Sequence, residues 1–218
     1  MRGQRRPFLG YKTPNVTRRN KAGGTTRIIA CAVFKPAIEH LRLARRYPNL
    51  RLTYLPSNLH LTPQKLENCL LGEINFAEKR NERMICLYGE CFPGLKDICA
   101  QHGAITVPGH YCHEMLLGTE QFQQLMYETA GTYFVDRDLI LNFGEYCIEP
   151  LELHDEEMRK CCFEHYQRLL YVRQPADPDL VPSARELAEF LELSLEIRDA
   201  DYSYLERKLI DVIQPGLL

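Results

Sequence analysis

The sequence lacks any long hydrophobic stretch. No run approaches the roughly 18 consecutive apolar residues that a transmembrane helix needs, so we expect no membrane anchor. Arg5 and Arg6 resemble the core of a twin-arginine export signal. Such a signal continues into an apolar stretch of about 7 to 15 residues, whereas residues 10–15 read Gly-Tyr-Lys-Thr-Pro-Asn. These absences predict a soluble, cytoplasmic protein.

The chain also lacks the short motifs of several common protein classes. It has no Gly-x-Gly-x-x-Gly sequence after a predicted strand, no phosphate-binding Gly-Lys-Ser/Thr loop and no Gly-x-Ser-x-Gly nucleophile turn. The glycine-rich residues 23–26 precede the first predicted strand rather than follow it, so they are interpreted as a linker. The sequence therefore gives no support for the usual modes of nucleotide binding or for serine hydrolysis.

Acidic residues are absent from residues 1–37, where every charged side chain is Lys or Arg. We predict that residues 1–26 form a disordered, flexible basic arm, because this segment is also rich in Gly, Thr, Pro and Asn. The whole chain of 218 residues has a formal net charge of -2, which favours neither nucleic acid nor a membrane as partner. Residues 27–218 are predicted to form a single α/β domain, since 45% of the chain is apolar.

The pattern of apolar residues alternates between strand and helix. Short apolar runs predict strands at 27–30, 50–55, 84–88, 104–107, 169–173 and 195–197, with 131–135 either a strand or an extended connection. Helical spacing and helix-start residues predict helices at 36–47, after Thr62, at 93–101, from near Glu114, and at 119–129, 138–145, 155–168, 183–191 and 202–213. Repeated βα units predict an α/β fold with a mostly parallel sheet covered by helices.

The cysteine content is high. Nine cysteines form an odd number, so they cannot all pair in disulfides within one chain. In a reducing compartment such residues fill the core, bind metals or react. Cys69, Cys161 and Cys162 occur in predicted helical stretches and are interpreted as packing or surface residues.

Five other Cys and His residues each follow a predicted strand. They are Cys31 after the first strand, His60 after the second, Cys91 after the third, and His110 and Cys112 after the fourth. The carboxyl ends of parallel strands share one edge of a sheet, where ligands bind. We therefore expect the five residues to lie together as one metal or reaction centre. Gly and Pro in segments 88–94 and 107–114 suit a preorganised site, although they could equally serve only to end the strands.

The same residues carry a family resemblance. Five short motifs occur in order: Ala30-Cys31, Leu59-His60 followed by Pro63, Tyr88-Gly89-Glu90-Cys91, His110-Tyr111-Cys112 followed by Leu117-Gly118, and Gly131-Thr132-Tyr133. With these motifs the chain resembles the domain-of-unknown-function 1638 family from residue 28 to the end. Where that family usually has His-Asp-Cys, this chain has Tyr111 in the middle position.

The family has no assigned reaction to carry over. Some of its members occur near genes for corrinoid methyltransferases, so the resemblance implies an accessory role or an enzymatic step in corrinoid-linked methyl metabolism. The partners implied are a small-molecule substrate or a corrinoid-related protein.

The first hypothesis is a metal centre formed by Cys31, Cys91 and Cys112 with either His60 or His110. Zinc accepts thiolate and imidazole ligands in a tetrahedral set, and three cysteines could equally hold an iron-sulfur cluster. His113 is a weaker candidate because it is adjacent to Cys112. Glu90 and Glu114 are candidate catalytic bases or supports for the ligands, with the alternative that both are solvated carboxylates.

Two further hypotheses need no metal. Cys91 or Cys112 could be a thiolate nucleophile activated by a helix amino terminus and by His110 or His60. The chain could instead be a non-enzymatic module that binds a cofactor-bearing partner, with the basic arm and the acidic stretch 145–157 supplying contacts. The sequence leaves open whether the protein is an enzyme.

Overall fold

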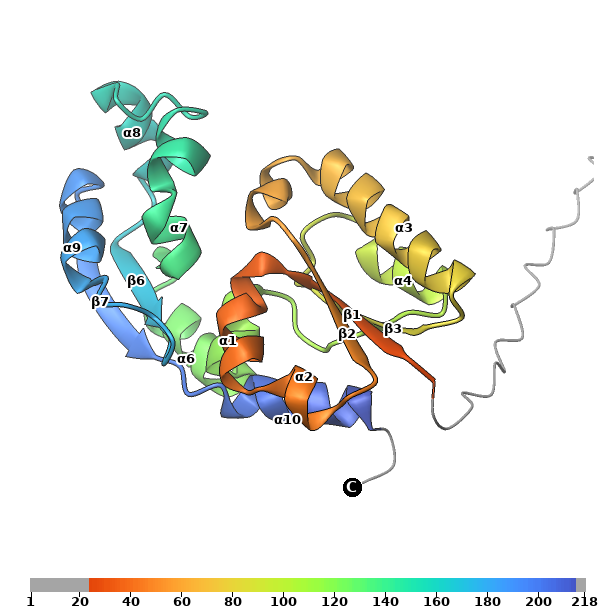
Figure 1. The fold of residues 1–218 in the computed structure, drawn as a ribbon. Coiled ribbons are helices and arrows are strands. Elements are labelled where there is room, and N and C mark those ends of the chain that lie inside the picture. The colour runs from red at the N-terminus through yellow and green to blue at the C-terminus, as the bar shows by residue number, and fades with distance from the viewer. Residues whose placement is uncertain (1–23, 215–218) are drawn as a thin grey trace, which may run out of the picture.

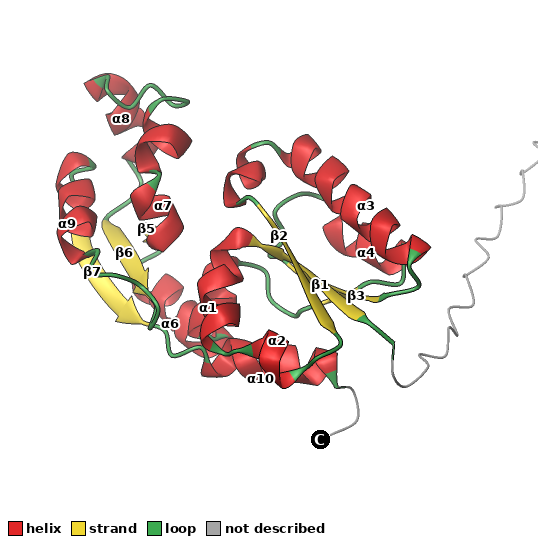
Figure 2. Cartoon of the chain, viewed as in Figure 1, coloured by secondary structure: helices red, strands yellow, loops and turns green. Residues whose placement is uncertain are grey.

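The computed structural model describes residues 24–214, and the strands of this part of the chain form two parallel sheets (Figures 1 and 2). The first sheet has the order β2-β1-β3-β4, with β1 (Thr26–Cys31), β2 (Leu50–Leu55), β3 (Arg83–Leu87) and β4 (Ile105–Thr106). The second has the order β5-β6-β7, with β5 (Thr132–Val135), β6 (Arg168–Arg173) and β7 (Ser194–Asp199). The α/β class and the parallel pairing are confirmed, but the strands divide between two sheets where one was expected.

The helical elements follow the predicted alternation. They are η1 (Ala32–Phe34), α1 (Lys35–His40), α2 (Leu43–Arg46), η2 (Ser57–Leu61), α3 (Pro63–Lys79), α4 (Leu95–Gln101), α5 (Cys112–Leu117), α6 (Thr119–Glu128), α7 (Arg137–Leu141), the π-helical turn η3 (Gly144–Ile148), α8 (Glu156–Phe163), α9 (Val181–Phe190) and α10 (Ser203–Ile213). Within residues 24–214, no helix is both long and apolar enough to cross a membrane. The predicted basic arm lies outside the described residues, apart from residues 24–26.

Several predicted helices have different limits in the structure, and the one predicted at 138–145 is divided between α7 and η3. The helix predicted at 36–47 is split into α1 and α2, because Arg42 adopts the left-handed conformation with φ of 54°. The helix predicted at 155–168 ends at Phe163, and Arg168 already belongs to β6. Helix α9 begins before Ser183, which was predicted as its cap, because the chain turns helical at Val181 with Pro182 in the first turn.

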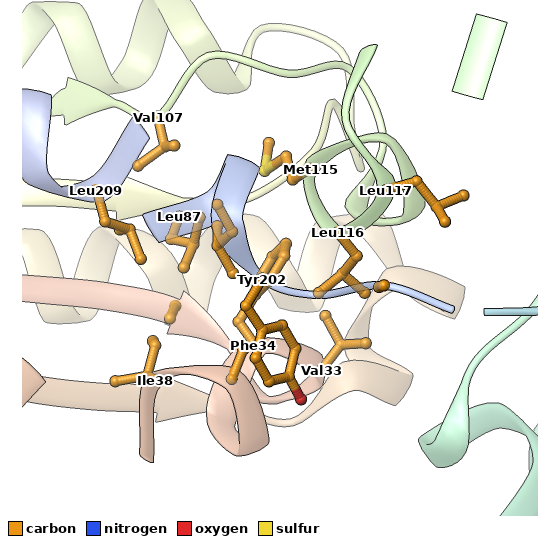
Figure 3. Packing of buried hydrophobic residues seen from close by; sticks show 14 of the residues in the cluster. Val33, Phe34, Ile38, Leu87, Val107, Met115, Leu116, Leu117, Tyr202 and Leu209 are labelled. Atoms are coloured by element: carbon orange, nitrogen blue, oxygen red, sulfur yellow. The ribbon is translucent and has the colours of Figure 1, made fainter. Parts of the chain in front are cut away.

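The first sheet is covered on both faces, as alternation along β1 requires. Ile28 and Ala30 pack in a cluster with residues of α1 and α10, whereas Ile29 packs in a separate cluster with residues of α3 and α4. Figure 3 shows side chains of the first cluster, among them Phe34 and Tyr202. Burial of each such large side chain contributes roughly 1.5–3 kcal/mol.

The first cluster continues into the second sheet. Leu170 and Val172 of β6 belong to it, while Leu169 and Tyr171 face the opposite side and pack against residues of α9. Helix α10 follows β7 but returns to the first sheet, as Figure 1 shows. There the guanidinium of Arg83 donates to the carbonyl oxygen of Ile213 at 3.0 Å. The two sheets therefore share a core, and this fixes how their strand ends face each other.

Candidate metal centre

The connections after β1, β2, β3, β4 and β5 meet around one cavity of about 350 Å³. All five Cys and His residues predicted from the sequence line it: Cys31, His60, Cys91, His110 and Cys112. The parallel topology explains this convergence, since Cys31 is the last residue of β1 and the other four lie in the segments that follow β2, β3 and β4. His113, Tyr133 and Asp136 line the same cavity.

Two of the loops approach each other at their backbones. The N–H of Glu90 donates to the carbonyl oxygen of His110 at 2.8 Å. A Cβ atom on Gly89 would lie only 2.8 Å from that same oxygen, so a residue with a side chain does not fit there. Gly89 therefore allows the loop that carries Cys91 to pack against the loop that carries Cys112.

The tightest group of donor atoms in the cavity joins Cys112, His113 and Asp136, whose ligating atoms lie within 4.8 Å of one another. The Cys112 Sγ atom lies 3.8 Å from Nδ1 of His113, and Nε2 of His113 lies 3.2 Å from Oδ2 of Asp136. The contact between His113 and Asp136 is close enough for an ion pair but does not have the geometry of a hydrogen bond. Within residues 24–214, this is the group whose spacing suits a shared ion.

Asp136 is held in place by the start of α7. Its Oδ1 atom accepts hydrogen bonds from the backbone N–H groups of Asp138 at 2.9 Å and Leu139 at 3.1 Å, so Asp136 is the N-cap of this helix. The other carboxylate oxygen is left to face His113. The carboxylate is buried, and its position comes from the second sheet because Asp136 directly follows β5.

The charges of this group support one another. Burial alone would lower the pKa of His113, but the neighbouring Cys112 and Asp136 raise that pKa to about 10. Burial alone would raise the pKa of Asp136, yet the contact with His113 and the cap hydrogen bonds hold it below its ordinary value. Asp136 is thus a buried carboxylate that favours a proton on the facing nitrogen of His113.

The other two thiols, those of Cys31 and Cys91, are half-buried, and neither has a Lys or Arg partner of the described chain in the cavity. Burial raises the pKa of Cys91 to about 11, and the nearby Cys112 adds to this shift. Burial also raises the pKa of Cys31 far above its ordinary value, with further contributions from Cys112 and Cys91. Within the described chain, no Lys or Arg lines the cavity, so little favours a free thiolate, whereas a bound metal ion would deprotonate such thiols outright.

His60 and His110 lie at the rim of the cavity and outside the tight group. His60 is exposed, and its Nδ1 atom lies 2.6 Å from the carbonyl oxygen of Ser57. The His110 side chain is 63% exposed, with Nδ1 3.0 Å from Oε1 of Glu90. The structure therefore brings His113 rather than these two predicted histidines next to Cys112.

The two candidate carboxylates have different surroundings. Glu90 is exposed and pairs with Lys96 and His110, and these partners lower its pKa, Lys96 having the larger effect. Glu114 is buried, and its oxygens accept hydrogen bonds from the backbone N–H of His110 and the hydroxyl of Thr119, both at 2.8 Å. Glu114 thus fixes the loop that leads into α5.

Asp136 was missed from the sequence, although the rule that found the other residues applies to it. It follows the run 131–135, which was interpreted as either a strand or an extended connection, and that run is strand β5. A carboxylate directly after a confirmed strand would have been a sixth candidate. His113 is a weaker candidate on sequence grounds because it is adjacent to Cys112.

The fold and the site together define a parallel α/β protein with a Cys/His/Asp pocket at the strand carboxyl edge. Residues 54–209 match the family model described as protein of unknown function (DUF1638), and the chain belongs to that family. The matched range includes His60, Cys91, His110 and Cys112 but begins after Cys31, so it is shorter than the range 28–218 expected from the motifs. No curated protein and no solved structure matches the chain.

Proposed function

We propose that this protein binds one transition-metal ion, for which zinc is the best match, through Cys112 and His113, with Cys91 and Cys31 as further thiol donors. The observation that carries the proposal is the Cys112–His113–Asp136 group. Bonds of about 2.3 Å from zinc to sulfur and about 2.0–2.1 Å to nitrogen place two tetrahedral ligands about 3.6 Å apart. The Sγ to Nδ1 distance of 3.8 Å is close to that spacing.

Asp136 supports this proposal from behind the ligand. A metal-binding imidazole commonly donates its second N–H to a carboxylate, which fixes the tautomer and the ring orientation. With Nε2 facing Asp136 at 3.2 Å, Nδ1 is the nitrogen left to bind the ion on the side of Cys112. In this proposal His113 is a ligand and Asp136 positions it.

An iron-sulfur cluster held by Cys31, Cys91 and Cys112 is the second candidate. One observation favours the cluster: thiols from three different connections line the cavity. Within the described chain, however, these thiols do not form a group as tight as the Cys112–His113–Asp136 group. A cluster is larger than one ion and spaces its cysteine ligands further apart. Cys31 distinguishes the candidates, because the cluster requires it whereas zinc can be held without it.

The cavity sets limits on the ligand. A volume of about 350 Å³ is at the small end of the range for small-molecule sites, and it suits a small substrate better than a corrinoid ring. The family resemblance implies a role in corrinoid-linked methyl metabolism. If the protein has this role, the corrinoid would therefore be bound by a separate partner protein.

Tyr88 lines the cavity, and its buried hydroxyl has no partner within residues 24–214, which favours a ligand with an oxygen acceptor.

The metal-free alternative, with Cys91 or Cys112 as nucleophile, has less support. A nucleophilic cysteine usually has a lowered pKa, caused by a nearby cation or a helix amino terminus. Burial instead raises the pKa of Cys91 to about 11. A metal ion accounts for three half-buried thiols around one cavity, whereas a nucleophile accounts for one.

Metal analysis of the full chain, purified without oxygen, tests the proposal. We expect stoichiometric zinc in the wild type, its loss in Cys112→Ser and His113→Ala, and its retention in Cys69→Ser and Cys161→Ser, whose cysteines are exposed and lie outside the cavity. Iron with inorganic sulfide, lost in Cys31→Ser, would instead support the cluster. A protein without stoichiometric zinc or iron, in which one thiol is selectively alkylated, would contradict both.

A further inference from the structure

Aromatic rings line the cavity at the proposed metal centre. Its walls include six Phe and Tyr residues: Phe34, Tyr88, Tyr111, Tyr133, Phe134 and Tyr146. Phe34 and Tyr88 are buried, whereas the other four are exposed or half-buried and belong to the loop before α5, to β5 and to η3. The rings that a ligand can reach therefore come from three separate segments of the chain.

Tyr111 is the most accessible of these rings. It is 59% exposed, and one side of the ring stacks on Phe122 with a distance of 5.5 Å between the ring centroids. The face of an aromatic ring is electron-rich and attracts cations. Within residues 24–214, no Lys or Arg lies over any of the six rings, although such contacts occur elsewhere, as between Arg27 and Phe76 at 5.0 Å. The rings of the cavity are therefore available to a cation from outside the described chain.

The charged side chains of the cavity favour a cation as well. Three carboxylates line it, those of Glu90, Asp136 and Asp138, whereas no Lys or Arg of the described chain does. Glu90 pairs with Lys96, and Asp136 faces His113. Two of the three carboxylates thus have a basic partner already.

Asp138 differs from the other two carboxylates in its partners. Its side chain accepts hydrogen bonds from the hydroxyl of Ser57 and, at 3.2 Å, from the side-chain amide of Asn142. Both donors are neutral, so they leave the negative charge of Asp138 without compensation. A positively charged ligand in the cavity would supply that compensation, whereas an anion would be repelled.

We propose that this cavity binds a methylated ammonium group, with Tyr111 and the neighbouring rings around its methyl groups and Asp138 as its counter-charge. Aromatic rings are the surface on which proteins recognise quaternary ammonium ligands. A neutral apolar ligand would use the rings but not the charge, and a small hydrated cation would use the charge but not the rings. The substrate class of the site is therefore small molecules with a methylated ammonium end.

The proposed metal centre is compatible with such a ligand. Three thiolates more than offset the charge of a divalent ion, so a centre held by Cys31, Cys91 and Cys112 would not repel a cation. The identification of the methylated ammonium compound as the substrate rests on the proposed metal function, whereas its binding by the rings and Asp138 does not.

NMR titrations of the full chain test the proposal with three ligands, at an ionic strength held constant with sodium chloride. Choline carries a trimethylammonium group and also an oxygen, which suits the unpartnered hydroxyl of Tyr88. Its neutral isostere dimethylbutanol has carbon in place of nitrogen, and ethanolamine lacks the methyl groups. We expect choline to shift the backbone signals of Gly89 and Tyr111 and to bind about tenfold more tightly than either of the other two. Equal affinity for choline and dimethylbutanol, or for choline and ethanolamine, would overturn the proposal.

Two substitutions test the residues that the proposal names. Tyr111→Leu should weaken choline binding roughly two- to fivefold, whereas Tyr111→Phe keeps the ring and should bind like the wild type. Asp138→Asn should weaken it about tenfold. The matched controls are Tyr127→Leu, at a 93% exposed position on α6, and Asp211→Asn, at an exposed position on α10, and both should bind like the wild type. Thermal unfolding verifies that each variant is folded.

Metal content, measured on the same samples, separates this proposal from the metal function. A wild type that holds no metal but prefers choline would contradict the metal function and leave the cation site standing. A zinc-loaded wild type without this preference would overturn the cation site and leave the metal function standing. The cation site would also be overturned if folded Tyr111→Leu and Asp138→Asn both bound choline as tightly as their controls.

Discussion

His113 and Asp136 follow strands of different sheets, and their side chains meet at 3.2 Å. His113 is the second residue of α5, which follows β4 of the first sheet, whereas Asp136 directly follows β5 of the second. Because Asp136 is buried and the His113 side chain is only 15% exposed, this contact depends on how the shared core places the two sheets. The imidazole of His113 therefore faces a carboxylate that belongs to the other sheet.

Asp136→Asn should weaken metal binding by about 10–100-fold, the range found when the carboxylate behind a metal-binding histidine is replaced. Asparagine is as good an N-cap as aspartate, so α7 should persist in Asp136→Asn. Asp136→Ala removes the cap and should lower the free energy of unfolding by about 1 kcal/mol relative to Asp136→Asn. Competition with a chelator measures the affinity. Asp155→Asn makes the same change at the exposed N-cap of α8 and should have no effect on the metal. Wild-type affinity in Asp136→Asn would remove Asp136 from the proposed centre.

Gly89→Ala should force apart the loops that carry Cys91 and Cys112. The added Cβ would meet the carbonyl oxygen of His110 at 2.8 Å, and both partners are backbone. We expect a loss of roughly 1–3 kcal/mol in the free energy of unfolding, together with weaker metal binding. Urea unfolding with a parallel metal assay measures both.

The matched control for this change is Gly72→Ala. Gly72 is inside α3, and a Cβ there would have open space around it. Alanine should stabilise the helix by roughly 0.5–1 kcal/mol and leave the metal site unchanged. The loop packing inferred at Gly89 would be refuted by two glycine variants of equal stability and equal metal affinity.

The convergence of Cys31, Cys91 and Cys112 on one cavity could be predicted because it depends on a general property of parallel sheets. Short apolar runs locate the strands, and the residue after each run then lies at the carboxyl edge. The division into two sheets could not be predicted in this way. The local pattern of apolar residues predicts that residues 132–135 are extended. Whether this strand pairs with β4 or with β6 depends on long-range packing, and in the structure it pairs with β6.

The identity of the histidine in the tight group depended on local geometry that the sequence does not contain. His60 and His110 occupy positions as regular as those of the cysteines, yet both side chains are directed to the rim, where Ser57 and Glu90 hold them. His113 lies one residue after Cys112 on α5, and its ring turns so that Nδ1 comes within 3.8 Å of the sulfur. In this orientation Nε2 faces Asp136, which belongs to another part of the chain.

Glu114→Ala should reduce the free energy of unfolding by about 1–3 kcal/mol, because it leaves the backbone N–H of His110 without its acceptor. Glu114→Gln keeps one acceptor oxygen and should cost less. Glu90→Gln, at an exposed carboxylate, should leave the unfolding midpoint unchanged. Urea unfolding of the three variants distinguishes a structural from a chemical role. Wild-type stability in Glu114→Gln with complete loss of metal would assign Glu114 to the chemistry instead.

Removal of the metal should lower the stability of the wild type. A ligand that binds only the folded state adds about 2.7 kcal/mol at a free concentration of 100 times Kd, which corresponds to roughly 5–10 °C in Tm for a chain of this size. Differential scanning calorimetry before and after treatment with a chelator, followed by addition of zinc, measures this change. Cys112→Ser should unfold at the temperature of the metal-free wild type and should not respond to zinc.

The matched control for metal removal is Cys69→Ser, which removes an exposed thiol of α3 outside the cavity and should keep the full zinc response. If both serine variants respond to zinc like the wild type, zinc binds elsewhere, because a surface site made by other residues would not need Cys112. If only Cys112→Ser loses the response, the stabilising ion is bound where the two sheets meet, since Cys112 lies within 4.8 Å of the Asp136 carboxylate that follows β5.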